Sequence, residues 1–150
     1  MFESHEDQFT EPDSPPNAGP ANLKGNEFSQ LDFELQFFDR ILAQNPDYVD
    51  VLRVHADNLT SKGQYASGLA ADRHLARLRP KDPAIHYNLA CSYSLLHMND
   101  AAIGALDSAL RLGYRNVEHL LKDSDLDHVR KDARFVGLLG RYLLKSKASK

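Results

Sequence analysis

Small and apolar residues of this chain recur with a 34-residue period, which is also the spacing of Pro46 and Pro80. A shift by this period superposes residues that suit close helix packing: Ala56 on Ala90, Gly68 on Ala102, Leu75 on Ala109 and Leu78 on Leu112. Such a period is typical of arrays of paired helices, in which each pair buries its apolar face against its neighbours. The pattern therefore predicts an all-α fold with an extended binding surface.

Apolar residues three and four positions apart predict successive helices within this period. The expected helices span about 29–45, 49–61, 65–79, 83–96 and 100–112, followed by short turns and an amphipathic helix at about 135–143. Ser29 and Asp82 are residue types that begin a helix, Pro83 suits the first helical position, and Gly113 suits a helix end. No segment has the strict alternation of a half-buried strand.

Two successive units share leucine, small and aromatic positions: Leu52, Ala56, Leu59, Gly63, Tyr65, Gly68 and Leu75 in the first, and Leu89, Ala90, Tyr93, Ala102, Leu106 and Ala109 in the second. These residues resemble the signature of the tetratricopeptide repeat (TPR) family. Four positions depart from it: His55, Asp72, His97 and Tyr114. The resemblance implies an α-α superhelix of antiparallel helix pairs, with complete repeats at about 47–80 and 81–114.

The regions outside the two repeats complete the expected organisation. A half repeat precedes them, and residues 120–139 resemble a terminal element that follows TPR arrays in bacterial proteins, which implies a helical cap at about 115–146. Residues 1–27 are rich in proline and acids, so we expect a disordered acidic tail. The helical domain then covers 28–146, and a flexible tail covers 147–150.

Composition narrows the class of partner and the compartment. The formal net charge of −3 at pH 7 gives no sign of the concentrated basic face that nucleic-acid binders carry. Cys91 is the only cysteine, so no intramolecular disulfide can form, and no apolar run has the length of a membrane span. We therefore expect a cytoplasmic protein that binds no nucleic acid and has no membrane span.

In TPR domains the first helix of each pair lines the concave groove, and the resemblance implies which residues line it here: Asp50, Arg53, Val54, Asp57, Tyr87, Asn88, Cys91 and Leu95. The main hypothesis is a non-catalytic scaffold or adaptor that binds a short peptide or helix of another protein in this groove. The competing interpretation is a solvated helix face, with Arg53 paired to Asp50 or Asp57 on its own helix.

One known use of such grooves, capture of a chaperone's C-terminal carboxylate, is disfavoured. Asp57 and Glu118 stand where that site needs Asn and Lys, and both would repel a carboxylate. An alternative to groove binding is self-association through the first helix, which carries four aromatic residues: Phe28, Phe33, Phe37 and Phe38. One helix face packed on the core needs fewer aromatic residues than these four. Pairing of this helix with a second copy would make the chain a homodimer or a structural building block.

The sequence indicates no catalytic, metal or cofactor site. No two histidines have the three- or four-residue spacing that pairs ligands on a helix. Residues 123–127 begin like a calcium loop, but His128 and Arg134 stand where Gly and Glu are needed, so we expect helix caps there. Cys91 and His86 are five residues apart on one helix and face apart. We therefore expect a protein that is not an enzyme and holds no cofactor.

Overall fold

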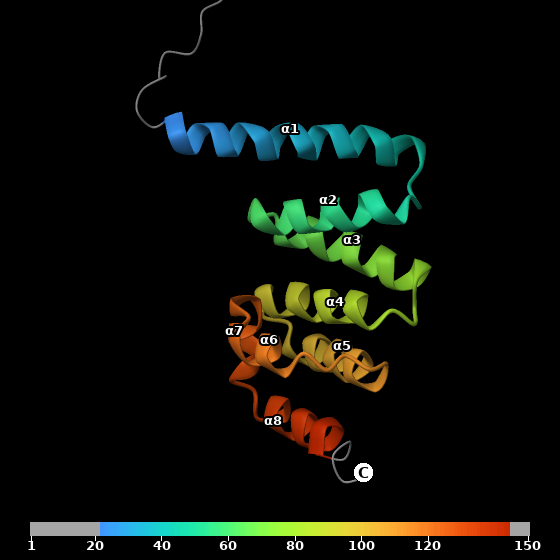
Figure 1. Ribbon diagram of the computed structural model, residues 1–150, viewed down its shortest axis with the longest axis vertical. Coiled ribbons are helices and arrows are strands. Elements are labelled where there is room, and N and C mark those ends of the chain that lie inside the picture. The colour runs from blue at the N-terminus through green and yellow to red at the C-terminus, as the bar shows by residue number, and fades with distance from the viewer. Residues whose placement is uncertain (1–21, 145–150) are drawn as a thin grey trace, which may run out of the picture. The chain divides into compact units, whose positions relative to one another are not determined.

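The computed structural model describes residues 22–144, together with the side chains of residues 30–143 (Figure 1). The chain divides into two compact units, Met1–Phe33 and Glu34–Lys150. The boundary between them falls inside the first helix, so the described part of the first unit is helical. The elements that carry the site described below all belong to the second unit.

The first helix, α1, spans Asn22–Gln44 and starts earlier than expected. We predicted that order begins near Asn26 to Ser29, after a disordered tail over 1–27, and the start is wrong because the helix already includes residues 22–25. Adding residues to a helix that already exists avoids the cost of nucleating a new one. No proline lies within α1 to interrupt it. The remaining parts of the predicted tails, 1–21 and 147–150, lie outside the described residues.

All regular elements among residues 22–144 are helical, which confirms the predicted all-α class. After α1 they are α2 (Val49–Ser61), α3 (Tyr65–Leu78), α4 (Pro83–Leu95), α5 (Asn99–Arg111), α6 (Val117–Lys122), the 3₁₀ turn η2 (Ser124–Leu126), α7 (Asp127–Arg130), α8 (Ala133–Leu139) and the π-helical turn η3 (Gly140–Leu144). Helix α2 packs on α3, α3 on α4 and α4 on α5, so neighbours in sequence are neighbours in space (Figure 1). This is the packing of a helical-repeat array.

The turns between these helices follow local residue chemistry. Asp82 caps α4 with Pro83 at its first position, and Gly113 follows α5 with φ 112, as the sequence predicts. His97 has φ 60 although it is not glycine, a conformation that is costly for an L-residue. Its ring stacks on that of His128 in α7, with centroids 3.9 Å apart. This contact joins the α4–α5 turn to the C-terminal elements.

The core lies where the 34-residue pattern places small residues. Ala90, Ala102 and Ala109 have no exposed surface, which allows α4 and α5 to approach closely. Phe135 and Leu138 of α8 belong to the same buried cluster, so α8 covers apolar surface of the preceding repeat. Within the described part of the chain, no helix is long and apolar enough to cross a membrane.

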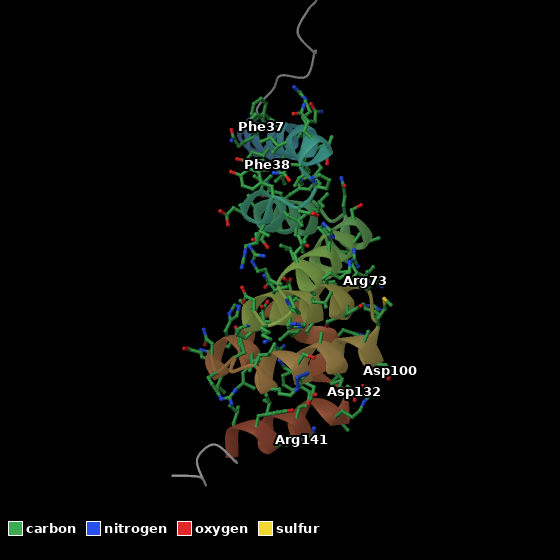
Figure 2. All side chains as sticks on the ribbon, turned by 90° about the vertical axis from the view of Figure 1, so that its right-hand side faces the viewer. Phe37, Phe38, Arg73, Asp100, Asp132 and Arg141 are labelled. Carbon is green, nitrogen blue, oxygen red and sulfur yellow. The ribbon has the colours of Figure 1, made fainter. Side chains whose placement is uncertain are left out.

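Charged pairs attach α8 and η3 to α5. Arg134 donates to Asp100 on α5 and to Asp132, the cap of α8, both at 2.8 Å. Figure 2 shows the two acids close together between these helices. Arg141 lies 3.4 Å from Asp107, about two turns further along α5. Because these pairs are largely exposed, each contributes little to the stability of the fold.

Candidate functional site

A cavity of about 350 Å³ lies between the first helices of successive pairs. Its walls come from α2 (Asp57, Thr60, Ser61), α3 (Asp72), α4 (Tyr87, Asn88, Cys91, Ser92), α6 (His119) and the segment after α6 (Asp123, Asp125). We call this set of residues the acidic pocket. Its volume is near the lower end of the range of roughly 300–1,000 Å³ found for ligand sites.

Four carboxylates line the acidic pocket: Asp57, Asp72, Asp123 and Asp125. No Lys or Arg is among the residues that line it. Like charges gathered around a hollow create a negative potential there, which raises the local concentration of cations. The pocket is therefore suited to a cationic group and unsuited to a carboxylate or phosphate.

Asp123 connects three elements at one wall of the pocket. Its Oδ2 accepts hydrogen bonds from the Tyr87 hydroxyl at 2.6 Å and the Cys91 thiol at 3.8 Å, and His119 Nε2 lies 3.2 Å away. Its Oδ1 accepts the backbone N–H of Asp125 at 3.0 Å and so caps η2. The helix-capping role expected for this segment is confirmed, and the same carboxylate also ties it to α4.

Arg130 holds the Asp123 segment in place. One guanidinium nitrogen donates to the backbone carbonyls of Leu120 at 3.1 Å and Asp123 at 2.7 Å. The other terminal nitrogen donates to the Asp127 carboxylate at 2.6 Å, while the buried Nε has no partner among the described residues. Arg130 thus positions the backbone that presents the Asp123 carboxylate to α4.

Asp72 is the most deeply buried carboxylate of the pocket, with 4 % of its surface exposed. Its Oδ2 accepts a hydrogen bond from the Ser92 hydroxyl at 2.6 Å, across the contact between α3 and α4. Burial raises the pKa of Asp72 from 3.8 to about 6; the Ser92 bond opposes this rise and the charge of Asp57 adds to it. A buried acid that binds its proton this tightly is sensitive to any charge placed beside it.

The carboxylates of Asp57 and Asp125 are perturbed in the same direction. Burial raises the pKa of Asp57, although nearby Arg53 opposes the rise. The pKa of Asp125 is also raised, first by burial and then by the charges of Asp123 and Asp127. Because both carboxylates resist ionisation, a cation in the pocket would stabilise their charged forms.

The eight predicted groove residues divide into two sets. Four line the acidic pocket: Asp57, Tyr87, Asn88 and Cys91. Four do not line it: Asp50, Arg53, Val54 and Leu95. Arg53 donates to Asp82, the cap of α4, at 2.7 Å, so its hydrogen-bonded partner lies on the next repeat and not on α2.

Tyr87 has a different role from the ligand contact that we expected. It is 3 % exposed, and its ring stacks on Tyr114 with centroids 4.4 Å apart and planes 5° apart. Burial raises the pKa of its hydroxyl, followed by the effects of Cys91 and Asp123. The side chain therefore supports the pocket wall, and its hydroxyl donates a hydrogen bond to Asp123.

The predicted self-association residues occupy several environments. Phe33 is 64 % exposed and Phe37 is 45 % exposed, whereas Phe38 is half-buried with its ring edge-on to His55, centroids 6.5 Å apart. Figure 2 shows Phe37 and Phe38 on α1. The side chain of Phe28 lies outside the described residues. Phe38 thus packs within its own unit.

The pocket contains one group of potential metal ligands, formed by Cys91 Sγ and carboxylate oxygens of Asp123 and Asp125, all within 4.8 Å of one another. Burial raises the pKa of the Cys91 thiol, and the charges of Asp123 and Asp125 add to the rise. A thiol must lose its proton to bind a metal, so we assign no ion to this group. His86 bonds to the Pro80 carbonyl at 2.8 Å and not to Cys91.

Sequence reasoning missed half of the pocket. Thr60, Asp72, Ser92 and His119 were not assigned to it, and Asp123 and Asp125 were interpreted only as part of a helix-capping segment. One signal was present: Asp72 occupies a position at which the repeat signature has an apolar residue. A carboxylate at a buried helix position is costly unless something pairs with it, and this cost marks a candidate site.

Comparison with known proteins gives one partial match. Over 56 residues the chain is 39 % identical to a chloroplastic protein of Arabidopsis thaliana. The match covers 37 % of this chain and 17 % of that protein, so the chain corresponds to a small part of its relative's length. No family model matches the chain.

Proposed function

We propose that this protein is a non-catalytic, TPR-like scaffold or adaptor that binds a segment of another protein at the face formed by α2, α4 and α6. A lysine or arginine side chain of that segment enters the acidic pocket. The observation that supports this proposal is the convergence of four carboxylates on one hollow whose lining includes no lysine or arginine. A partner cation would supply the missing charge.

The proposal also depends on which polar groups remain available to a ligand. Asp123 is occupied by Tyr87 and Cys91, and Asp72 by Ser92. Asp57 is the exposed carboxylate of the lining, so it can meet a cation without breaking the hydrogen bonds of Asp72 and Asp123. Specificity then requires that the ligand be charged, since a neutral group leaves these carboxylates uncompensated.

A matched pair of peptides tests this function. One short, capped peptide carries a single arginine, and the other carries citrulline, which has the same shape without the charge. Titration followed by NMR near pH 7 should show the Asn88 side-chain signals moving with the arginine peptide and much less with the citrulline peptide. Asp57→Asn should weaken arginine-peptide binding about fivefold, as expected for loss of roughly 1 kcal/mol from a partly exposed ion pair.

Asp50→Asn is the control for this variant. It removes the same charge from the same helix at an exposed position that does not line the pocket. Binding should therefore be unchanged by this substitution. Equal binding of the two peptides, or equal weakening by the two variants, would contradict the proposed function.

A second function, self-association through α1, has weaker support. We propose it because Phe33 and Phe37 each expose a large part of an aromatic ring, and exposed apolar surface often marks an interface. Light scattering over a range of concentrations tests it. A mass that stays at one chain, 16.9 kDa, at high concentration would exclude this function, and Phe37→Ser should reduce any dimer that forms.

A further inference from the structure

We infer that a cation entering the acidic pocket displaces the proton of Asp72, so that occupancy of the pocket is coupled to proton release. This inference rests on the proposed function, because it concerns the same cationic ligand. The O–H bond of the Asp72 carboxyl breaks, its proton passes to water or buffer, and the ligand's positive charge replaces it. No other reactant is needed.

The geometry that carries the inference is the position of Asp72. It lies on α3, the second helix of its pair, and its side chain lines the cavity while being almost fully buried between neighbouring helices. The Ser92 hydroxyl donates to its Oδ2 at 2.6 Å, which keeps the carboxyl in place in either protonation state. Water therefore solvates this group poorly, and a bound cation is the available way to stabilise its charge.

The charge of Asp57 favours the neutral form of Asp72. The titratable groups that share the pocket with Asp72 are Asp57 on α2, Tyr87 and Cys91 on α4, His119 on α6, and Asp123 and Asp125 after α6. Three of them are acids, and Arg53, the cation that acts on Asp57, is committed to Asp82. With burial as the main cause, the pKa of Asp72 is about 6. The empty pocket thus holds a proton over a range in which an ordinary aspartate has lost it.

The size of the coupling can be stated both as the effect of pH on cation affinity and as the effect of the cation on the ionisation of Asp72. If the cation binds only the ionised form, a carboxyl of pKa about 6 is about nine-tenths ionised at pH 7 and about one-tenth at pH 5, so affinity falls about tenfold. By reciprocity, the ligand makes the Asp72 proton easier to remove. A ligand concentration about ten times the dissociation constant for the ionised form should move the pH midpoint of Asp72 down by about one unit.

The experiment follows the Asp72 carboxyl carbon by NMR in the full chain as the pH is raised from about 4 to about 8. The probe is N-acetyl-arginine methylamide, held at about ten times the dissociation constant that it shows near pH 8. The control is the citrulline analogue with sodium chloride at equal ionic strength, and Asp72→Asn identifies the signal. The expected result is a midpoint near 6 with citrulline and a midpoint about one unit lower with arginine.

Three variants separate the contributors. Asp72→Asn should lose the tenfold pH dependence of arginine binding, and Asp57→Asn should keep most of it. His119→Gln removes the other side chain whose class usually changes charge near neutral pH, and the dependence should remain.

Each result other than the expected one overturns a specific claim. If the arginine probe moves the Asn88 signals but leaves the Asp72 midpoint in place, the coupling is wrong and the proposed function stands. If the pH dependence of arginine binding disappears with His119→Gln and not with Asp72→Asn, the released proton comes from His119, and the assignment to Asp72 is wrong. If neither probe moves any pocket signal at any pH, the proposed function and the coupling both fail.

Discussion

Replacing Asp72 with asparagine should make the folded protein more stable at neutral pH. The substitution removes a buried negative charge and keeps an oxygen that accepts the hydrogen bond from Ser92. Most substitutions at buried positions destabilise a protein. A gain here would show that the carboxylate is retained at a cost to the fold, as is common at binding sites.

The size of this gain follows from the pKa of Asp72, which is 3.8 for a fully solvated aspartate side chain and about 6 in the folded chain. One pKa unit corresponds to about 1.4 kcal/mol, so ionising Asp72 destabilises the fold by about 3 kcal/mol. Because the folded pKa is the higher one, the penalty is absent well below pH 3.8, grows as the pH rises, and is complete above about pH 6. Between these limits, near pH 5, it is roughly half of its full size.

Urea denaturation at about pH 5 and about pH 7.5 measures this effect. The free energy of unfolding of Asp72→Asn should exceed that of the unchanged protein by about 3 kcal/mol at the higher pH and by roughly half of that at the lower. Asp50→Asn, an exposed acid, should show no comparable gain at either pH. A variant that is less stable at neutral pH, or a gap that does not grow with pH, would refute the reasoning.

Other substitutions test the elements around the pocket by the same denaturation measurement. Asp82→Ala removes the cap of α4 and the partner of Arg53, and should cost about 1–2 kcal/mol; an unchanged stability would show that neither contact matters. Arg130→Gln leaves two backbone carbonyls without a charged donor, and should cost about 1.5–3 kcal/mol and speed amide exchange in α6. Leu120→Ala should cost about 2–5 kcal/mol while its neighbour Leu121→Ala changes stability by less than about 0.5 kcal/mol, because the two side chains are 0 % and 51 % exposed. Equal losses for the two leucines would contradict the packing of α6.

Local signals in the sequence predict most of the helices and their turns. Asp82 with Pro83 begins a helix for reasons contained within a few residues, and Gly113 ends one in the same way. The start of α1 was missed because a plausible cap at Ser29 does not prevent a helix from continuing upstream through it.

The acidic pocket was only half predictable, since its two walls meet through tertiary packing. Asp57 and Asn88 lie on the first helices of the repeats and were found from the repeat register. Asp123 reaches Tyr87 only because Arg130 and the η2 cap fold the segment after α6 back onto α4. No spacing rule for this segment connects it to a residue in the previous repeat. Contacts of this kind depend on the docking of elements that have irregular sequences.

The charged pairs that join α8 and η3 to α5 also favour α5 over other helices as their packing partner. Asp100 and Asp107 receive Arg134 and Arg141, and the residue at the place of Asp107 one period earlier, on α3, is Arg73 (Figure 2). Docking α8 and η3 on α3 in the same register would therefore set Arg141 against Arg73, and wrong pairings are disfavoured by such like-charge contacts. In a chain without the second repeat, α8 and η3 would follow α3, and Arg141 would meet Arg73 instead of Asp107. The charges of the outer helices thus add a small preference for the observed order of elements to the one that apolar packing gives.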